Sequence, residues 1–343
     1  MRIHNSCDYI REVVKNVKPS MAYDGSMPLS QWQPMACEKL KDLLGLPLAC
    51  CDADYTVLKE TKNEEYTRID FEFQSEPGYY VPCTLLIPAN LQGPAPVAIC
   101  LQGHSTGKHI SLGEAKYEGD KPNTGGRNIA IQAVQQGFCA IALEQRYMGS
   151  CGQPDGEPRT AASACCGPFT AMASLLLGRT MIGERVWDIS RLIDLIEERF
   201  TDIIDPKKVI CMGNSGGGTA TFYAACMDPR IYMAISSCAV CTYDASIMAL
   251  YHCNCNYIPG VRSYFNMGDL GCLIAPRRLV VVCGDEDAYF PLEGVKESFR
   301  VIQQGYKDAG KEDRCRLVIG KGGHQFYPED AWPVAKELME KAD

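Results

Sequence analysis

Residues 209–227 read VICMGNSGGGTATFYAACM, and their pattern is the strongest indication of the fold. The apolar run 209–212 is typical of a strand buried on both faces, and the small residues from Gly217 onward predict a helix. Between them, residues 213–217 match the pattern G-x-S-x-G. A side chain at either glycine would clash with the adjoining strand or helix, and the tight turn lifts the Ser215 hydroxyl above the sheet. Ser215 is therefore the candidate nucleophile.

A serine hydroxyl is a weak nucleophile and needs a base. With this type of turn the partners follow in the order serine, acid, histidine, and only His252 and His324 lie downstream of Ser215. His324 stands in a glycine-rich loop, GKGGHQF, directly after the strand-like run 316–319. Such a loop can bring the imidazole over the serine, so we predict that His324 is the base.

The acid is expected after the apolar run 279–283, where GDEDAYFP offers three carboxylates. We predict Asp287, because it has the G-x-x-D-x-x-x-P spacing familiar from serine hydrolases. Asp285 would lie closer to the strand end, and Glu286 would point to solvent. The Asp287 carboxylate would accept the Nδ1–H of His324 and stabilise the imidazolium that forms during catalysis.

An oxyanion hole needs two backbone donors. One is expected from Gly216, the residue after the nucleophile, because its amide lies at the start of a helix whose dipole favours negative charge. The second is expected from the loop QGHSTG, which follows the apolar run 97–101. We predict the amide of His104 or Ser105, and the alternative is an ordinary tight turn without a donor.

Three further residues are candidates for contacting the substrate: Arg146, Tyr243 and His252. Arg146 follows another strand end, in EQRYMG, where a structural salt bridge is an equally good interpretation. Tyr243 and His252 lie in an insertion that we expect to line the pocket. For His252 a structural or substrate-facing role fits better than catalysis, and His109 is expected at the surface.

Most of the chain alternates between strand-like and helix-like segments. Residues 66–88 nearly alternate apolar and polar positions and break at Glu76-Pro77-Gly78, which is typical of a β-hairpin. Short apolar runs and helical segments then follow in turn, which favours a mostly parallel sheet with helices on both faces. The expected strands are residues 97–101, 138–143, 208–212, 233–238, 279–283 and 316–319, and the expected helices are residues 128–136, 183–200, 217–226 and 292–305.

The length of 343 residues fits one elaborated α/β domain. Residues 1–60 carry helix-like apolar spacing and no catalytic motif, so they predict a helical extension packed on a catalytic domain of residues 61–343. Two segments, about 150–180 and 239–275, interrupt the alternation. Open sheets place substrate pockets at long insertions after strand ends, so we expect both segments to form pocket walls.

The composition is that of a soluble globular protein, with 46% hydrophobic and 22% charged residues and a formal net charge of -8. An acidic balance without a basic run argues against nucleic acid or an anionic membrane as partner. The chain has no P-loop or dinucleotide fingerprint, so we expect a small-molecule ester substrate and no cofactor. The N-terminus lacks an apolar secretory core, which favours a cytoplasmic location.

The chain contains 19 cysteines, an odd number that cannot all pair within it. Many lie in apolar runs, where cysteine behaves as a small hydrophobe, so we expect a reducing compartment and no disulfide framework. The tightest cluster is His252-Cys253-Asn254-Cys255. Its C-x-C spacing lacks a second ligand pair at zinc-finger distance, so we interpret it as structural and expect no metal.

The chain resembles the α/β-hydrolase superfamily, and within it a bacterial family related to dienelactone hydrolases and acetyl xylan esterases. The resemblance spans about residues 97–326 and includes LQGHSTGKH, ALEQRYMGS, LLGRTMIGERVWDI, CMGNSGGGTATFYAACMDPRI, CNYIPG, LIAPRRLVVVCGDEDAYFP and GGHQF. It implies the α/β-hydrolase fold, the triad Ser215, Asp287 and His324, and hydrolysis of carboxylic esters, often small acyl groups on sugars. Dienelactone hydrolases use a cysteine nucleophile, so Ser215 points to the esterase branch.

These observations predict a serine carboxylic-ester hydrolase that works through an acyl-enzyme without a metal. The first alternative is a peptidase of the prolyl-oligopeptidase type, which shares this elbow and triad order. About 60 residues before the hairpin are too few for a propeller, and cleavage of dipeptidyl-nitroanilides would favour this alternative. The second is a non-catalytic binding protein with the same fold, which a fluorophosphonate probe would not label.

Overall fold

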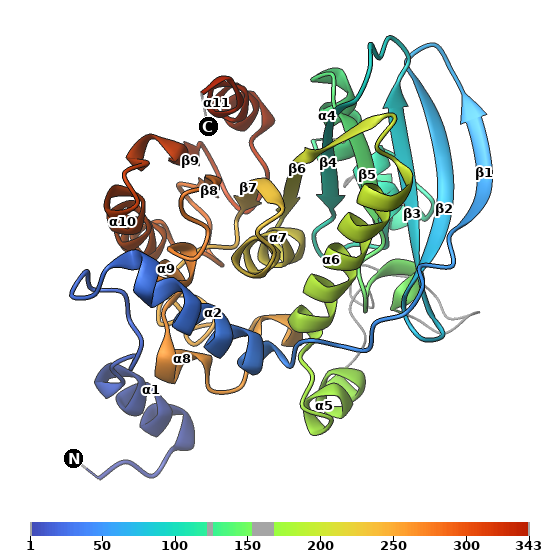
Figure 1. The fold of residues 1–343 in the computed structure, drawn as a ribbon. Helices are drawn as coiled ribbons and strands as arrows, with labels where there is room; N and C mark the ends of the chain where they lie inside the picture. Colours follow the sequence, from blue (N-terminus) through green and yellow to red (C-terminus); the bar gives the residue numbers. More distant parts are fainter. Residues whose placement is uncertain (1, 122–125, 153–167, 342–343) are drawn as a thin grey trace.

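A nine-stranded sheet forms the centre of the protein in a computed structural model that describes residues 2–121, 126–152 and 168–341 (Figure 1). The strand order is β1-β2-β3-β5-β4-β6-β7-β8-β9. The first three strands and the β3–β5 pair are antiparallel, whereas all pairs from β5 to β9 are parallel, which confirms the predicted mostly parallel sheet. The strands are β1 (Thr56–Lys62), β2 (Tyr66–Glu76), β3 (Tyr79–Pro88), β4 (Ala95–Leu101), β5 (Cys139–Leu143), β6 (Ile204–Asn214), β7 (Ile231–Ser237), β8 (Arg278–Gly284) and β9 (Cys315–Gly320).

The predicted hairpin is the antiparallel pair of β2 and β3, whose register places Phe71 opposite Cys83. Both side chains are buried, because alternate positions of each strand face the core. β1 pairs with β2 at the edge of the sheet, and all seven of its residues are exposed. It has no apolar pattern, so nothing in the sequence predicts it. It begins at Thr56, and the end of the range 1–60 is therefore strand instead of helix.

The central parallel strands are buried on both faces, which explains their continuous apolar runs. Every residue of β5 and β8 is buried. The register aligns Asn214 at the end of β6 with Ser237 at the end of β7, and Gly284 of β8 with Gly320 of β9. Parallel strands end at the same edge of a sheet, so the turns that follow β6, β7, β8 and β9 lie next to one another.

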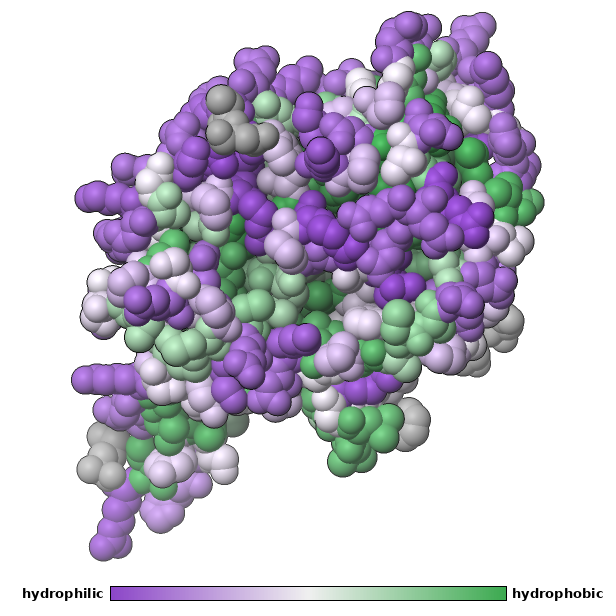
Figure 2. Space-filling model, in the orientation of Figure 1, coloured by the Kyte–Doolittle hydropathy of each residue, from purple (hydrophilic) through white to green (hydrophobic). Residues whose placement is uncertain are grey.

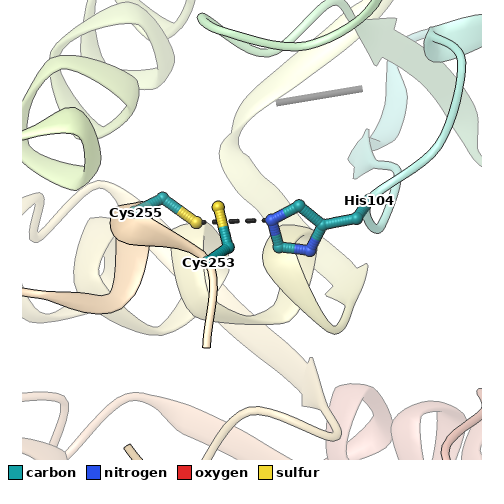
Figure 3. Close-up of side chains that lie close together, drawn as sticks. All are labelled: His104, Cys253 and Cys255. Carbon is teal, nitrogen blue, oxygen red and sulfur yellow. Dashed lines mark hydrogen bonds between the residues drawn. The ribbon is translucent and has the colours of Figure 1, made fainter. Parts of the chain in front are cut away.

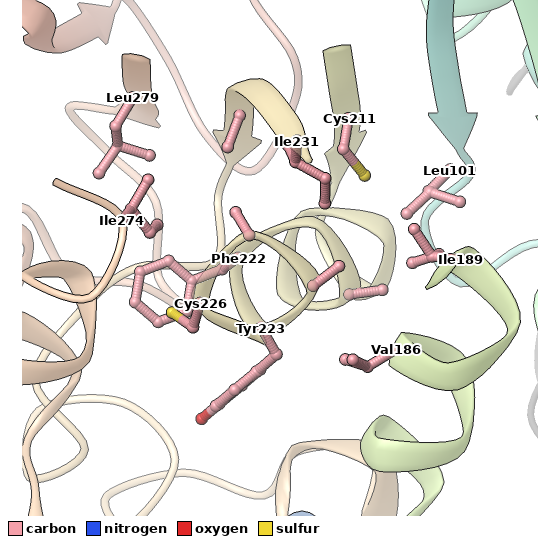
Figure 4. Close-up of a cluster of buried hydrophobic side chains, with 14 of the residues drawn as sticks. Leu101, Val186, Ile189, Cys211, Phe222, Tyr223, Cys226, Ile231, Ile274 and Leu279 are labelled. Atoms are coloured by element: carbon pink, nitrogen blue, oxygen red, sulfur yellow. The ribbon is translucent and has the colours of Figure 1, made fainter. Parts of the chain in front are cut away.

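Helices cover both faces of the sheet, as predicted, and each face has its own hydrophobic core. On one face α2, α6, α7 and α10 share a large core, and Figure 4 shows Phe222 of α7 and Ile189 of α6 beneath strand residues such as Cys211. On the other face α4 and α11 form the second core. The helices are α1 (Ser6–Asn16), α2 (Leu29–Leu44), α4 (Ile129–Gln135), α5 (Pro168–Leu176), α6 (Met181–Arg199), α7 (Gly216–Met227), α8 (Val261–Tyr264), α9 (Met267–Gly271), α10 (Leu292–Asp308) and α11 (Pro328–Glu340).

The two N-terminal helices differ in how they contact the rest of the chain. α2 buries Trp32, Leu40 and Leu44 in the same core as α6 and α7, whereas α1 has no buried residue. α1 lies at one end of the molecule, beside the N-terminus (Figure 1). The division of the chain into an extension and a catalytic domain at residue 60 stays a prediction.

The structure describes the two predicted insertions to different extents. Residues 153–167 of the first insertion lie outside the described residues. Its later part forms α5, where Met172 and Leu176 are exposed. Together with the exposed Leu177 directly after the helix, they give the apolar surface seen at this position in Figure 2. The second insertion contains the 3-10 turn η4 (Asn254–Asn256), α8 and α9.

Two findings concern the described residues as a whole. No disulfide joins two cysteines within residues 2–121, 126–152 and 168–341, where many cysteines, such as Cys100, Cys211 and Cys283, are buried on strands. In the same residues, no helix combines the length and the apolar character that crossing a membrane requires.

Candidate active site

Ser215 occupies a strained turn between β6 and α7. Its backbone angles, φ of 56° and ψ of -121°, lie in a region that residues other than glycine rarely adopt. The Ser215 amide donates to the carbonyl of Ser237, 2.9 Å away, so the turn is bound to the end of β7. The backbone therefore holds the Ser215 side chain at the carboxyl edge of the sheet, where it is half-buried.

The glycines of the elbow allow three backbone segments to approach closely. A methyl group on Gly217 would overlap the carbonyl oxygen of Leu101 and lie 2.7 Å from the carbonyl oxygen of Gln102. A methyl group on Gly213 would lie 2.5 Å from the carbonyl carbon of Gly217. The G-x-S-x-G spacing thus reflects packing of β4, β6 and α7 against one another.

Replacing Gly217 with alanine is expected to lower the free energy of unfolding by about 1–3 kcal/mol, because backbone must move to admit the methyl group. Urea unfolding followed by circular dichroism measures the change. Gly119→Ala is the matched control, since a methyl group there meets no atom within 4 Å. Equal stability of the two variants would contradict this description of the elbow.

The structure brings His324 and Asp287 together. The His324 Nδ1 atom lies 2.8 Å from Oδ2 of Asp287, and both residues stand in loops after neighbouring strands, β9 and β8. The two alternative acids lie elsewhere. Asp285 accepts from the Lys321 ammonium at 2.8 Å, and Glu286 is exposed.

The surroundings of Asp287 keep its carboxylate ionised. Burial by itself would raise the pKa of Asp287, but the hydrogen bond and charge of His324 lower it, as do the amides of Tyr289 and Phe290, and the net pKa is below its ordinary value. Those amides donate to Oδ1 at 2.8 and 3.1 Å. The Phe290 ring stacks on the His324 imidazole with centroids 5.8 Å apart, so the ring plane is fixed as well.

Ser215 and the His324–Asp287 pair lie on the same edge of the sheet, at the ends of β6, β9 and β8. Cys238, which follows β7, lies between these strands, and its sulfur is within 4.8 Å of a carboxylate oxygen of Asp287 and a ring nitrogen of His324. In the described residues, no hydrogen bond joins the Ser215 hydroxyl to His324. Catalytic hydrogen bonds are often long without substrate and shorten when it binds.

The loop after β4 lies against the elbow. A methyl group on Gly103 would lie 3.4 Å from Cβ of Ser215, and one on Gly216 would lie 3.0 Å from Nδ1 of His104. In the part of the chain that the structure describes, the amides of His104, Ser105 and Gly216 have no protein acceptor. Amides of this kind beside a nucleophile are suited to hold an oxyanion.

Glu144, which follows β5, holds this loop in place. Its Oε1 accepts from the side-chain amide of Gln102 at 2.8 Å and from the backbone amide of Lys108 at 3.0 Å. Burial raises the pKa of Glu144. Glu144 of the motif EQRYMG therefore positions the loop after β4. The sequence predicted a role in the site for Arg146 of this motif and none for Glu144.

Two candidates for substrate contact, Arg146 and Tyr243, are buried among other protein groups. The Arg146 guanidinium binds Asp188 at 2.6 Å and Glu76 at 2.5 Å and stacks on Tyr79, so the salt-bridge interpretation describes its structure. Tyr243 is buried in the core, where it meets another tyrosine hydroxyl. Protein groups surround both side chains, and contact of either with a substrate stays a prediction.

His252 lies beside the base. Its ring is 6.1 Å from that of Tyr289 and 5.4 Å from that of Phe290, the same two rings that contact His324. Burial lowers the pKa of His252, and the nearby His324 and His104 lower it further. The position is compatible with the predicted structural or substrate-facing role.

The prediction that His109 lies at the surface is wrong. Its side chain is buried, and its Nε2 lies 2.8 Å from Oδ2 of Asp120 and 3.1 Å from the Thr106 hydroxyl. Hydrogen bonds to these groups compensate for burial of the imidazole. The sequence could not show this, because Asp120 lies in a segment without any regular pattern.

Comparison with known proteins assigns the chain that carries this site to a family. The sequence profile of the Abhydrolase family matches residues 2–314. The chain belongs to this family. The α/β-hydrolase resemblance seen in the sequence is thereby confirmed.

One relative by sequence and two solved structures of similar fold show how far the likeness of this Abhydrolase chain extends. The putative hydrolase YtaP of Bacillus subtilis (strain 168) is 24% identical over 255 residues, which are 73% of this chain and 78% of YtaP. A solved structure of a putative acetyl xylan esterase from Bacteroides fragilis NCTC 9343 superposes with a TM-score of 0.80 at 17% identity and covers 99% of this chain and 96% of that one. For a glucuronoyl esterase from Solibacter usitatus the TM-score is 0.66 at 16% identity, with 95% and 98% covered. These structures share the Abhydrolase fold.

Several residues of this Abhydrolase site were not predicted from the sequence. They are Cys238, Tyr289, Phe290, Glu144 and Met148. The methyl group of Met148 lies beside Gly216. Each follows the end of a parallel strand within ten residues. Position after a strand end is therefore the signal that could have found them.

Proposed function

We propose that the protein is a serine carboxylic-ester hydrolase that acts through an acyl-enzyme. The observation that carries the proposal is the strained Ser215 elbow on the same sheet edge as the His324–Asp287 hydrogen bond. Strain at a non-glycine residue persists where the surrounding structure enforces it, and such positions cluster at active sites. The family assignment supports the same reaction class.

In the first half of the reaction, the Ser215 hydroxyl attacks the ester carbonyl while His324 takes the hydroxyl proton. The resulting oxyanion is stabilised by the amide of Gly216 and by that of His104 or Ser105. His324 then returns the proton to the leaving alcohol as the carbon–oxygen bond breaks. In the second half, water attacks the acyl-enzyme with His324 again as base, and the carboxylic acid is released.

We propose small acyl esters such as acetylated carbohydrates as the substrates. The Tyr289 ring lies 5.2 Å from the His324 ring and its residue is 52% exposed, so an apolar face is open beside the base. A sugar ring can pack on such a face. The solved structures of similar fold that are named as a putative acetyl xylan esterase and a glucuronoyl esterase support a carbohydrate ester.

A panel of esters tests the substrate class. Acetylated xylo-oligosaccharides and p-nitrophenyl acetate are expected to show kcat/KM at least about tenfold above the octanoyl ester, because each misplaced methylene group costs about 1–3 kcal/mol. Release of acetate and of p-nitrophenol is measured. Preference for the octanoyl ester, or no release of acetate from the sugars, would contradict this substrate class.

Covalent labelling tests the mechanism and separates the alternatives. A fluorophosphonate probe is expected to modify Ser215, and mass spectrometry of the labelled peptide identifies the modified residue. The control variant Ser263→Ala changes an exposed serine and is expected to be labelled as fully as the wild type. Absence of labelling would favour a binding protein. Cleavage of dipeptidyl-nitroanilides would favour a peptidase.

A further inference from the structure

Three potential metal ligands from distant parts of the chain meet beside the oxyanion loop. Cys253 and Cys255 flank Asn254 at the turn η4, and His104 lies in the loop after β4. One ligand atom from each of Cys253, Cys255 and His104 lies within 4.8 Å of the others. Figure 3 shows the Cys255 sulfur joined to a ring nitrogen of His104, with the Cys253 sulfur close to that contact. The third ligand, missing from the C-x-C motif in the sequence, is supplied by a residue about 150 positions earlier.

The separations suit a tetrahedral zinc ion. Zinc binds sulfur at about 2.3 Å and imidazole nitrogen at about 2.0 Å, so it holds two sulfurs about 3.8 Å apart and a sulfur and a nitrogen about 3.5 Å apart. Cys255 Sγ and His104 Nε2 are 3.4 Å apart. The other two separations are no more than 4.8 Å, so closing them requires shifts of at most about 1.3 Å. Two sulfurs and one imidazole also favour zinc over magnesium or calcium, which prefer oxygen ligands.

The turn η4 and the loop after β4, which carry these ligands, both contact α7. The Asn256 amide donates to the Cys253 carbonyl at 3.0 Å, and the Thr219 hydroxyl of α7 donates to Oδ1 of Asn256 at 3.2 Å. On the other side, the His104 ring packs against Gly216 at the start of the same helix. Ligands held in this way lose little conformational freedom when an ion binds.

We propose that Cys253, Cys255 and His104 form a zinc site that joins the oxyanion loop to the turn η4. The ion would bind Nε2 of His104, while Nδ1 and Cε1 face Gly216. Three protein ligands leave a fourth coordination position, as in zinc sites that also bind water or an exogenous group. The ligands are distinct from the Ser215, His324 and Asp287 side chains. His104 would use its side chain for the ion, whereas only its backbone amide is a candidate donor in the proposed acyl transfer.

Spectroscopy with Co²⁺ tests the site without using catalysis. Added to reduced, metal-stripped full-length protein, Co²⁺ is expected to give a thiolate-to-cobalt charge-transfer band that saturates at one equivalent, and Zn²⁺ is expected to abolish that band. The double variant Cys253→Ser/Cys255→Ser is expected to lose the band, and His104→Gln to weaken it. Cys50→Ser/Cys51→Ser, which changes two adjacent cysteines elsewhere, is the matched control and is expected to keep it.

A band that persists in the Cys253→Ser/Cys255→Ser protein would overturn the proposal. A band lost in Cys238→Ser but kept in that double variant would also overturn it, because the ion would then lie at the Cys238, Asp287 and His324 cluster. The same titration in Ser215→Ala is expected to match the wild type. An inactive wild-type protein with an intact band would contradict the proposed function and leave the zinc site standing. An active protein without a band would contradict the zinc site and leave the proposed function standing.

A second measurement needs no variant. Zn²⁺ is expected to protect Cys253 and Cys255 of the wild-type protein from alkylation by iodoacetamide, quantified peptide by peptide by mass spectrometry, while the rate at the exposed Cys7 stays the same. Protection is expected to increase with pH, because zinc binds the deprotonated thiolates. Equal alkylation of Cys253 and Cys255 with and without Zn²⁺ would overturn the proposal.

Discussion

Ser215→Ala is expected to lower kcat for p-nitrophenyl acetate by about 10⁴-fold or more, because the variant has no oxygen to form the acyl-enzyme. The residual rate would come from the remaining binding groups and the backbone amides of the oxyanion hole. Steady-state kinetics on the purified protein measure the loss. Turnover close to that of the wild type would contradict the assignment of Ser215.

Two controls make the Ser215 experiment specific. Ser263→Ala changes an exposed serine and is expected to alter kcat by less than about twofold. Ser215→Gly is expected to be as inactive as Ser215→Ala but more stable than it by about 1 kcal/mol, because glycine relieves the strain at a φ of 56°. Urea unfolding compares the two, and equal stability would contradict the strain.

Asp287→Asn is expected to lower kcat by about 10³–10⁴-fold, because a neutral amide neither selects the His324 tautomer nor stabilises its imidazolium. The fold should persist, since the side chain keeps its size and one oxygen for the amides of Tyr289 and Phe290. Kinetics with p-nitrophenyl acetate and a thermal unfolding curve, measured on the same preparation, separate lost chemistry from lost structure.

The neighbouring carboxylates supply matched controls for Asp287→Asn. Glu286→Gln changes an exposed side chain one residue away and is expected to leave kcat within about twofold. Asp285→Asn removes the charge that binds Lys321 and is expected to cost less than about tenfold. If Asp285→Asn reduced kcat more than Asp287→Asn did, Asp287 would not be the acid.

The central fold could be predicted because its signals are local. Each buried parallel strand is a short apolar run, and the hairpin breaks at Glu76-Pro77-Gly78. β1 could not be predicted, since its edge strand TVLKETK pairs through backbone atoms and buries no side chain. The helix α11, after His324, was also missed, although its Trp332 packs in the second core.

In the site, the residues predicted from the sequence are those that stand in short motifs. The residues that only the folded chain brings next to the site were not predicted. Ser215, Asp287 and His324 each follow a strand, and their spacing is recognisable along the chain. Their catalytic roles, and the oxyanion roles of Gly216, His104 and Ser105, stay predictions that the variants above would test. The sequence did not predict Glu144, because its role depends on contacts with the distant residues Gln102 and Lys108, or Cys238, because it belongs to no recognisable motif.

Local patterns are enough to predict the strand, turn and helix around Ser215 and the alternation that builds the sheet, because periodic burial and glycine spacing act over a few residues. The pairing of Arg146 with Asp188, of His109 with Asp120 and of His104 with Cys255 is visible only in the folded chain. Such pairs join residues whose separation along the chain carries no pattern. They form because packing of the loops and helices around the sheet brings them within a few ångströms.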